Sequence, residues 1–237
     1  MRANERKAPM NKTLAPFALA AFALAALALA ASGTASAQTA GTWFAKGGVN
    51  NIAPKVKSGD LSAPSIPGTK IDVKSATAAI FTLGYMLSDE VSFEFYAGLP
   101  YKHEVVGDGS IKGVGKLGTI KQVSPTLFAQ HRFLEPGGPF RPYLGLGLTY
   151  AHFYGGEGSG TLTSLTNPGG SPTKLSASSA FGLSPQLGAT LALGERWFLD
   201  VSVIKTFIKN KSTLSTGQTI NIKLDPVSSN LSLGYRF

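Results

Sequence analysis

The chain has 237 residues, with 22 Lys and Arg against 13 Asp and Glu for a net charge of +9, and it contains no cysteine. The lack of cysteine excludes a disulfide framework, a thiol nucleophile and a Cys-ligated metal site. A basic chain can bind nucleic acid, but no basic-aromatic module is visible in this sequence. The export signal described next also argues against a nucleic-acid partner.

The N-terminus is predicted to be a signal peptide. An apolar run over residues 14–31 is followed by the small-residue cleavage site Ala35-Ser36-Ala37 and preceded by basic residues, which are Arg2, Arg6, Lys7 and Lys12. An uncleaved anchor is the alternative, but Pro16 and the alanine-rich composition argue against a stable spanning helix. We expect residues 1–37 to be removed and residues 38–237 to form the mature protein. The four basic residues and one acid of the leader reduce the mature net charge from +9 to +6.

Beyond residue 37, no apolar segment approaches the roughly 20 residues of a membrane helix, so a membrane crossing would need strands. Alternating apolar and polar or small residues predict eight strands. They are 42–49, 75–87, 91–100, 118–133, 141–154, 179–193, 197–208 and 223–237. The connections 50–74, 101–117, 155–178 and 209–222 are long, whereas 88–90, 134–140 and 194–196 are short. Long external loops and short periplasmic turns are typical of an outer-membrane barrel.

The last strand has the strictest alternation. Leu231, Leu233, Tyr235 and Phe237 share one face, and small or polar residues including Arg236 share the other. This pattern favours a lipid-facing strand of an all-β, eight-stranded antiparallel transmembrane barrel over an ordinary half-buried edge strand. Bacterial outer-membrane proteins characteristically end on such a strand, so Leu233, Tyr235 and Phe237 are the expected signal for the barrel-insertion machinery. A soluble lipocalin-like barrel also has eight strands, but its apolar faces have no reason to point outward.

Aromatic residues gather near the predicted short turns, as in the interfacial girdle of an outer-membrane barrel. The predicted girdle consists of Trp43, Tyr85, Phe133, Phe140, Tyr143, Trp197, Tyr235 and Phe237.

The opposite strand face carries polar and charged residues that are expected to fill the lumen. An eight-stranded barrel is only wide enough for its interior to be filled by side chains. We therefore expect opposite charges to pair there as a polar plug rather than to line a wide aqueous pore. The predicted plug consists of Lys46, Glu94, Gln130, Arg132, Gln186, Asp200, Asn230 and Arg236.

Several ordered segments together resemble the OmpW family of small outer-membrane proteins over essentially the whole mature chain. The segments are Gly48-Val49-x-x-Ile52-x-Pro54, Leu83-Gly84-Tyr85-x-x-Ser88-Asp89, Pro100-Tyr101-Lys102-His103, Pro125-Thr126-Leu127, Phe140-Arg141-Pro142-Tyr143-x-Gly145-x-Gly147-x-x-Tyr150, Lys223-Leu224-Asp225-Pro226 and Gly234-Tyr235-Arg236-Phe237. The resemblance implies an eight-stranded barrel that passes small hydrophobic molecules across the outer membrane. The chain departs from the family by extra Pro and Ser in its first loop and by Ser124, where the family often has a second proline.

A plugged barrel needs another exit for a hydrophobic solute, and two prolines indicate one. Proline cannot donate to a strand ladder, yet Pro100 ends the third predicted strand and Pro125 lies inside the fourth. Counted from the short turns, they lie at similar heights on neighbouring strands. We expect a locally unpaired lateral seam there, with simple bulges above the membrane as the alternative. An apolar mouth leading to the seam is expected from Ile52, Val56, Leu61, Tyr150, Phe153, Tyr154 and Phe181.

Two other functions remain open. A structural or adhesive barrel would use its basic loops to bind lipopolysaccharide, phage, bacteriocins or host surfaces. Catalysis would have to involve His103 and Glu104, but no Gly-x-Ser-x-Gly nucleophile motif occurs. We expect a monomeric, non-enzymatic protein without cofactor or metal, integral to the bacterial outer membrane. Its expected partners are outer-membrane lipid, lipopolysaccharide, the insertion machinery and small hydrophobic solutes.

Overall fold

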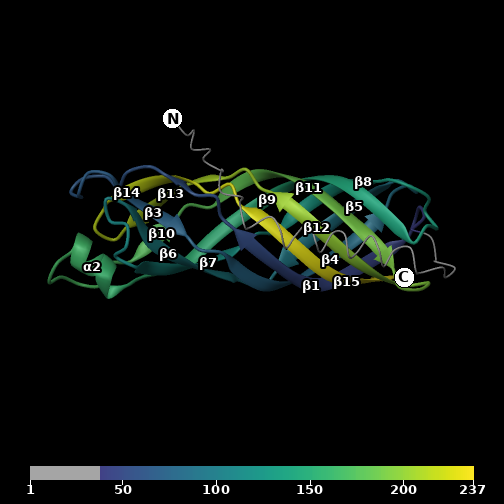
Figure 1. Ribbon diagram of the computed structural model, residues 1–237, viewed down its shortest axis with the longest axis horizontal. Coiled ribbons are helices and arrows are strands. Elements are labelled where there is room, and N and C mark those ends of the chain that lie inside the picture. The colour runs from purple at the N-terminus through teal and green to yellow at the C-terminus, as the bar shows by residue number, and fades with distance from the viewer. Residues whose placement is uncertain (1–37) are drawn as a thin grey trace, which may run out of the picture.

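A computed structural model describes residues 38–237, and the predicted signal peptide lies outside the described residues. Eight strands close into an antiparallel barrel in the order β1-β4-β5-β8-β9-β11-β12-β15, with β15 paired back to β1 (Figure 1). The eight-stranded barrel predicted from the sequence is confirmed. The strands are β1 (Trp43–Ala53), β4 (Ala76–Met86), β5 (Val91–Gly98), β8 (Thr126–Arg132), β9 (Phe140–Gly158), β11 (Ala180–Ala192), β12 (Trp197–Lys205) and β15 (Val227–Arg236).

The two ends of the barrel differ in their connections. Short turns join β4 to β5, β8 to β9 and β11 to β12. The C-terminus lies at this end, and Gln38 is tied to it because its backbone N–H donates to the Pro136 carbonyl oxygen at 3.2 Å. The layout of outer-membrane barrels makes this the periplasmic end and places the long connections outside the cell.

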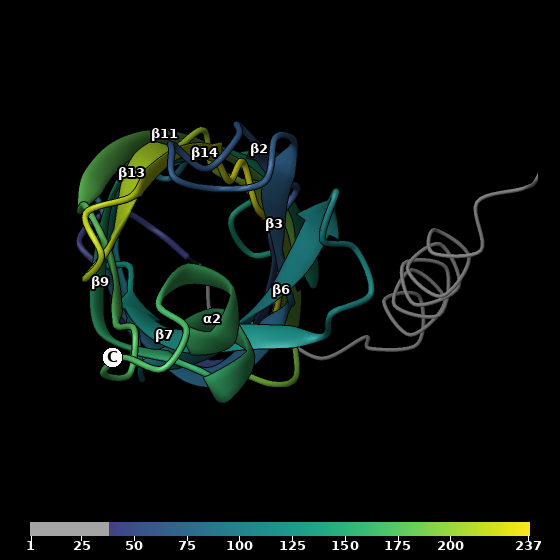
Figure 2. The ribbon, with the colours of Figure 1, turned by 90° about the vertical axis from the view of Figure 1, so that its left-hand side faces the viewer.

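The long connections are not irregular loops, in contrast to the sequence-based expectation. They contain β2 (Lys57–Ser58), β3 (Thr69–Val73), β6 (Tyr101–Gly109), β7 (Lys116–Val123), α2 (Gly160–Thr166), β10 (Leu175–Ala177), β13 (Lys209–Leu214) and β14 (Thr219–Lys223). The long strand β9 pairs with β8 near the periplasm and with β7 farther out, so the barrel wall continues beyond the membrane. Figure 2 views this extension end-on as a ring, with α2 across part of its opening.

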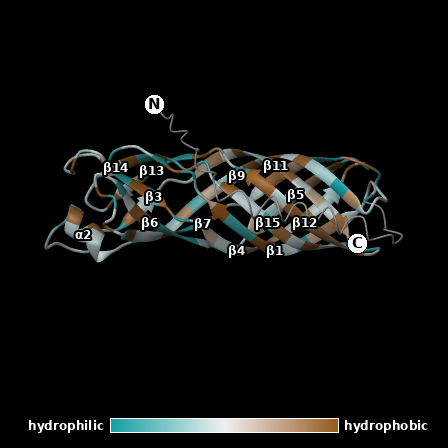
Figure 3. Ribbon diagram, in the orientation of Figure 1, coloured by the Kyte–Doolittle hydropathy of each residue, from teal (hydrophilic) through white to brown (hydrophobic). Residues whose placement is uncertain are grey.

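Apolar side chains cover the outside of the barrel. Alternation along β9 leaves Leu144, Leu146 and Leu148 more than half exposed, whereas Tyr143 before them and Thr149 after them are buried in the lumen. Figure 3 shows this banding of apolar and polar residues along the barrel wall. No helix within residues 38–237 is long and apolar enough to cross a membrane. An outward apolar belt of this kind is the lipid-facing surface of a transmembrane barrel.

Aromatic rings form contacts around the periplasmic rim. Trp43 lies 4.9 Å from Tyr85, and Trp197 lies 4.9 Å from Tyr235, measured between ring centroids. Tyr143 was expected in this girdle but is fully buried, because it occupies a lumen-facing position of β9. Leu191 of β11 has the same strand parity as the exposed Leu183 and Leu187 but is only 3% exposed.

Two glycines, Gly84 and Gly234, leave room for aromatic rings in the lumen. Each lies in a Leu-Gly-Tyr segment, the first at residues 83–85 and the second near the C-terminus at residues 233–235. Phe44 lies opposite Gly84, and Phe198 lies opposite Gly234, on neighbouring strands. A Cβ atom at Gly84 would lie 2.1 Å from Phe44 Cζ, and one at Gly234 would lie 2.2 Å from Phe198 Cζ. Only glycine leaves room for a ring at these positions. The packed rings close the lumen near the periplasm.

Candidate functional site

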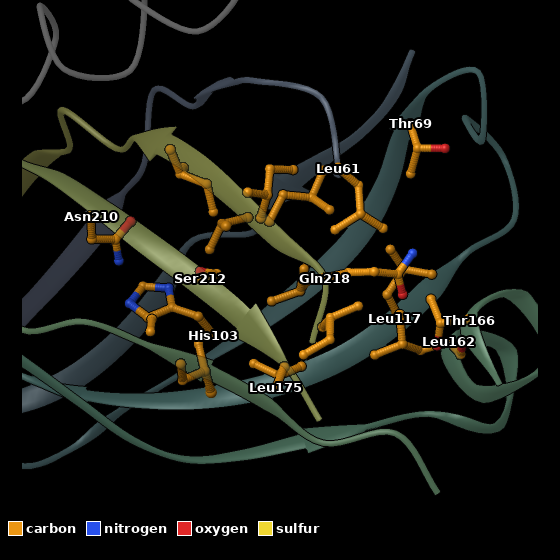
Figure 4. A pocket seen from close by; sticks show the side chains of 18 of the residues that line it. Leu61, Thr69, His103, Leu117, Leu162, Thr166, Leu175, Asn210, Ser212 and Gln218 are labelled. Atoms are coloured by element: carbon orange, nitrogen blue, oxygen red, sulfur yellow. Dashed lines mark hydrogen bonds between the residues drawn. The ribbon is translucent and has the colours of Figure 1, made fainter. Parts of the chain in front are cut away.

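The extracellular extension encloses an apolar cavity, here called the outer cavity (Figure 4). Its open space, mouth included, is about 1050 Å³. Inward positions of β3, β6, β7, β9, β10, β13 and β14 supply most of its wall, since alternate residues of a strand point to the same side. Residues that line it include Leu61, Val105, Leu117, Phe153, Ile220 and Ile222.

A second, inner cavity of about 610 Å³ lies below the outer one, within the barrel. Pro54, Gln122 and Leu224 line both cavities, so the two are contiguous. The inner cavity is bounded by apolar side chains such as Ile52 and Ile204. Among the described residues, no Asp, Glu, Lys or Arg lines either cavity.

The wall of the inner cavity contains an interruption of the strand ladder, here called the seam. The pairing of β5 with β8 ends at Tyr96 opposite Thr126, and the pairing of β6 with β7 resumes at Tyr101 opposite Gln122. Residues 97–100 and 123–125 do not pair with each other, although on their outer edges Gly98 pairs with Ile80 of β4 and Val123 pairs with His152 of β9. The Leu99 N–H instead donates to Ala79 of β4, at 2.9 Å.

The seam contains both predicted prolines, at its two ends: the register of Tyr96 with Thr126 places Pro125 level with Ala97, and that of Tyr101 with Gln122 places Pro100 level with Val123. Proline N atoms cannot donate, so Pro100 offers no N–H here, whereas Pro125 presents its carbonyl to the Tyr150 N–H of β9, on the strand edge away from the seam, at 3.0 Å. Gly98 and Ser124, on the two sides of the seam, line the inner cavity. The unpaired stretch of the wall therefore borders the cavity.

Below the inner cavity, polar side chains fill the lumen. The Lys46 ammonium lies 2.8 Å from Glu94 Oε2 and 3.2 Å from Asp200 Oδ1, and all three side chains are almost fully buried. Gln130 Nε2 donates to Gln186 Oε1 at 2.9 Å, which adds a cross-lumen hydrogen bond to the ion pairs.

The remaining members of the predicted plug extend this network towards the inner cavity and towards the periplasm. Asn230 accepts from the Tyr96 hydroxyl at 2.9 Å. Towards the periplasm, the Arg132 guanidinium lies between the rings of Phe44 and Tyr143, at 5.2 and 4.8 Å from their centroids. The Arg236 guanidinium lies 4.9 Å from the Phe198 centroid. All eight predicted residues are buried inside the barrel, at most 7% exposed.

Of the seven residues expected to form an apolar mouth, three line a cavity, one packs against the cavity wall and three lie elsewhere. Leu61 and Phe153 line the outer cavity and Ile52 lines the inner one. Val56 packs against the apolar cluster around the outer cavity without lining it.

The other three expected mouth residues are elsewhere. Tyr150, Tyr154 and Phe181 occupy outward positions of β9 and β11, and Phe181 is 68% exposed. Tyr150 and Phe181 are in ring contact at 4.8 Å on the outer wall. Alternate residues of a strand face opposite sides of the barrel wall. Tyr150, Tyr154 and Phe181 occupy positions that face outward, away from the outer and inner cavities.

Sequence reasoning missed most of the cavity wall because it treated residues 101–117 and 209–222 as loops. The alternation Ile220-x-Ile222-x-Leu224 was a signal that could have been used, since these three residues share the inner face of β14 and its extension. The short, lysine-rich strands around it concealed the pattern.

His103 is the one histidine among the cavity-lining residues. Its ring is 1% exposed, and its Nδ1 lies 2.9 Å from the Lys74 carbonyl oxygen. The flanking residues Lys102 and Glu104 are charged and point outward, which places this part of β6 beyond the apolar belt. Burial lowers the pKa of the His103 imidazole, although the bond to the Lys74 carbonyl opposes this effect. The ring is therefore neutral at pH 7.

The geometry separates the two residues considered for catalysis. His103 faces the cavity, whereas Glu104 lies on the outer face, 3.9 Å from the Lys116 ammonium. Within residues 38–237, no group of three or more His, Cys, Asp or Glu side chains has an arrangement suitable for a metal ion.

Comparisons with known proteins agree with this architecture. The model of the OmpW family matches residues 39–237. Outer membrane protein W of Vibrio cholerae is 31% identical over 201 residues, which cover 83% of this chain and 89% of that protein. The dibenzothiophene metabolism operon protein PahQ of Pseudomonas aeruginosa is 23% identical over 199 residues, covering 82% and 88%.

A solved structure extends the likeness to the fold. The crystal structure of the outer membrane protein OprG from Pseudomonas aeruginosa superposes with a TM-score of 0.76 and is 26% identical, covering 87% of this chain and 99% of that chain. The family match spans the barrel and its extracellular extension alike. The chain therefore belongs to the OmpW family of outer-membrane β-barrel proteins.

Proposed function

We propose that the protein is a passive conduit that takes small hydrophobic molecules from outside the cell and releases them sideways into the outer membrane. The observation that carries this proposal is the course of the two cavities: they run from the extracellular opening to the seam between Pro100 and Pro125. An apolar solute gains free energy by leaving water for such a cavity, and it gains no less by continuing into lipid.

The filled lumen supports a lateral rather than a straight route. Below the inner cavity, a solute would have to displace the buried Lys46, Glu94 and Asp200, whose charges are matched only by one another and by nearby polar groups. Breaking a buried ion pair is costly. The unpaired seam needs no such disruption.

The name of one relative also supports an apolar cargo. PahQ is named for an operon of dibenzothiophene metabolism, and dibenzothiophene is a small apolar molecule. By analogy, a molecule of that class suits the uncharged wall of the outer cavity, which includes Leu61 and Leu224.

Restoring the ladder at the seam tests this route. The double variant Pro100→Val/Pro125→Thr removes both proline rings and restores a backbone N–H at each end of the seam, so the wall should close there and the uptake of a radiolabelled medium-chain alkane should fall several-fold. Uptake is measured in a barrel-deficient strain that expresses the variant at the wild-type level.

The matched control is Pro185→Val. Pro185 also lies within a membrane strand, on β11, but it is exposed on the lipid face and opposite Leu146 in an intact ladder. This variant should transport as the wild type does. Unchanged uptake in the double variant, with the barrel correctly inserted, would overturn the lateral route.

A specific arrangement of lysines favours a second role, in binding lipopolysaccharide. Lys102 lies directly opposite Lys121 on β6 and β7, and Lys223 of β14 lies between Lys57 and Lys209 on its two neighbours. Like charges opposite one another destabilise a sheet. Lysines in this basic belt, defined as Lys57, Lys102, Lys121, Lys209 and Lys223, would be stabilised by bound phosphate groups.

The position of the basic belt along the barrel axis fits lipopolysaccharide as its partner. On one outward face, Lys209 follows the exposed Phe207 by two positions, so the lysines begin where the apolar surface ends. Lipopolysaccharide places its phosphates at this boundary of the outer leaflet. We also propose that the exposed C-terminal face of Leu233, Tyr235 and Phe237 is the signal for the barrel-insertion machinery.

A further inference from the structure

Hydrogen-bond acceptors without a partner lie along both cavities. In the outer cavity, the buried polar atoms of described residues that make no hydrogen bond are His103 Nε2 and Asn210 Oδ1. In the inner cavity, the corresponding atom is Asn50 Oδ1. A buried polar atom that loses water without gaining a partner is destabilising, so these atoms point to a ligand.

The hydrogen bonds that these side chains already make show which of their atoms can still accept a hydrogen bond. His103 Nδ1 faces a carbonyl oxygen, that of Lys74, so this nitrogen carries the proton of the neutral ring. Nε2 is then left with a lone pair, as an acceptor. Asn50 donates its amide N–H to the Tyr101 hydroxyl at 2.8 Å, which leaves its Oδ1 as an acceptor as well.

The amide of Gln122 interacts with the His103 ring, but no hydrogen bond to Nε2 of that ring or to the Oδ1 atoms of Asn50 and Asn210 is made within the described structure. Gln122 is on the adjacent strand and lines both cavities, but its Nε2 donates to Ser124 Oγ at 2.5 Å. Figure 4 shows the ring of His103 and the amide of Asn210 within the cavity, among aliphatic side chains. His103, Gln122 and Asn210 thus form a polar collar in the outer cavity, and Gln122 places that collar where the inner cavity begins.

We propose that the two cavities select apolar molecules that carry one uncharged hydrogen-bond donor, such as a medium-chain alcohol or a phenol. The hydroxyl group donates its single proton to one acceptor at a time, to His103 Nε2 or Asn210 Oδ1 at the collar and then to Asn50 Oδ1 on the way to the seam. The chain of the molecule occupies the apolar wall. This inference rests on the proposed conduit and narrows its substrate class.

Molecules of the same size are disfavoured for separate reasons. A hydrocarbon pairs none of the three acceptors, whereas the alcohol pairs one at a time, and this difference of one hydrogen bond should cost the hydrocarbon roughly tenfold in affinity. A carboxylate presents acceptors to acceptors and would be buried without an opposite charge, because no Lys or Arg among the described residues lines either cavity.

Nitrogen NMR of the histidine rings tests the binding mode. The protein is labelled with ¹⁵N-histidine, reconstituted in lipid nanodiscs and titrated with 1-octanol or with octane. The proposal predicts that 1-octanol shifts the His103 Nε2 resonance and that octane does not. His131 and His152 point outward and serve as controls within the chain, because they report alcohol dissolved in the lipid. Equal responses of all three histidines, or no response of His103, would overturn the proposal.

Uptake of the same two compounds separates the inference from the function on which it rests. The ratio of 1-octanol to octane uptake, corrected for the barrel-deficient strain, should fall about tenfold in His103→Leu and in Asn210→Leu. It should not change in His152→Leu, the matched control. Wild-type uptake of both compounds at equal rates would overturn the selectivity but leave the conduit standing. Uptake of neither compound above background would overturn the conduit itself.

Discussion

At the scale of single residues, Lys46 holds the largest concentration of buried charge in the barrel together. Its ammonium bridges Glu94 and Asp200, and each of these side chains is almost inaccessible to water. A cation between two carboxylates in so confined a lumen offsets the repulsion between their like charges. The alternation of the strands predicted that these residues share the lumen, but no local pattern in the sequence specified which charges pair.

Removing that cation should destabilise the barrel. Lys46→Met keeps the length and apolar stem of the side chain but leaves two buried carboxylates uncompensated. We expect the free energy of unfolding to fall by about 3–5 kcal/mol, as for other buried pairs that lose one partner. Urea titration of the protein in lipid vesicles, followed by its heat-modifiable gel mobility, measures the change. Lys112→Met, at an exposed loop position, is the control and should shift stability by less than about 0.5 kcal/mol. An equal, small effect of both changes would argue against a structural plug.

At the scale of strands, the sequence predicted the membrane-spanning part well and the external part poorly. The predicted segment 75–87 and the observed β4 (Ala76–Met86) differ by one residue at each end. Lipid imposes a strict period of two on such strands, and this period is visible in one sequence. The extension has no lipid on its outside, so its outward positions include lysine, serine and threonine and its pattern is weak.

The predicted strand 118–133 is wrong in one informative respect. It is divided into β7 and β8 by Ser124 and Pro125, and this division forms one side of the seam. Proline at position 125 predicted a local disturbance from its missing N–H alone. Whether the disturbance was a bulge or a gap depended on Pro100 across the sheet, which only the register of the two strands reveals.

The basic belt is also a feature of paired strands, and its role is testable there. The double variant Lys57→Gln/Lys209→Gln removes two charges flanking Lys223 and leaves its ion pair with Asp225, at 2.9 Å, in place. We expect binding of lipopolysaccharide to weaken roughly tenfold or more, since each lysine near an anionic membrane surface contributes about 1 kcal/mol. Surface plasmon resonance on the nanodisc-reconstituted protein gives the affinity.

The control for the belt uses lysines outside it. Lys112→Gln/Lys174→Gln removes the same charge from exposed positions at the far end of the extension. If this control weakens binding as much as the belt variant does, attraction depends on net charge and not on the arrangement of the belt.

At the scale of the whole molecule, the barrel is divided into an open apolar half and a closed polar half. The outer and inner cavities lie above the plug, and the seam lies where the two halves meet. Family membership places this molecule in the outer membrane, with the apolar belt in lipid and the extension outside. A solute that enters from outside thus reaches the side wall before it reaches the plug.

Reversible closure of the seam tests the lateral route most directly. The chain has no cysteine, so Leu99→Cys/Val123→Cys introduces a unique pair. These residues flank the seam, and the register of Tyr96 with Thr126 continues to place them opposite one another. Leu99 is 58% exposed on the lipid face, so a linker there leaves the cavities free. The pair can be joined by a small, reducible bis-methanethiosulfonate cross-linker.

The measurement is uptake of a radiolabelled hydrophobic compound by the same cells before cross-linking, after it and after reduction. The lateral conduit predicts that uptake falls to the level of the barrel-deficient strain when the seam is bridged and returns when the linker is reduced. Either single-cysteine variant, treated in the same way, should transport throughout. Full uptake through a completely bridged seam would contradict the account.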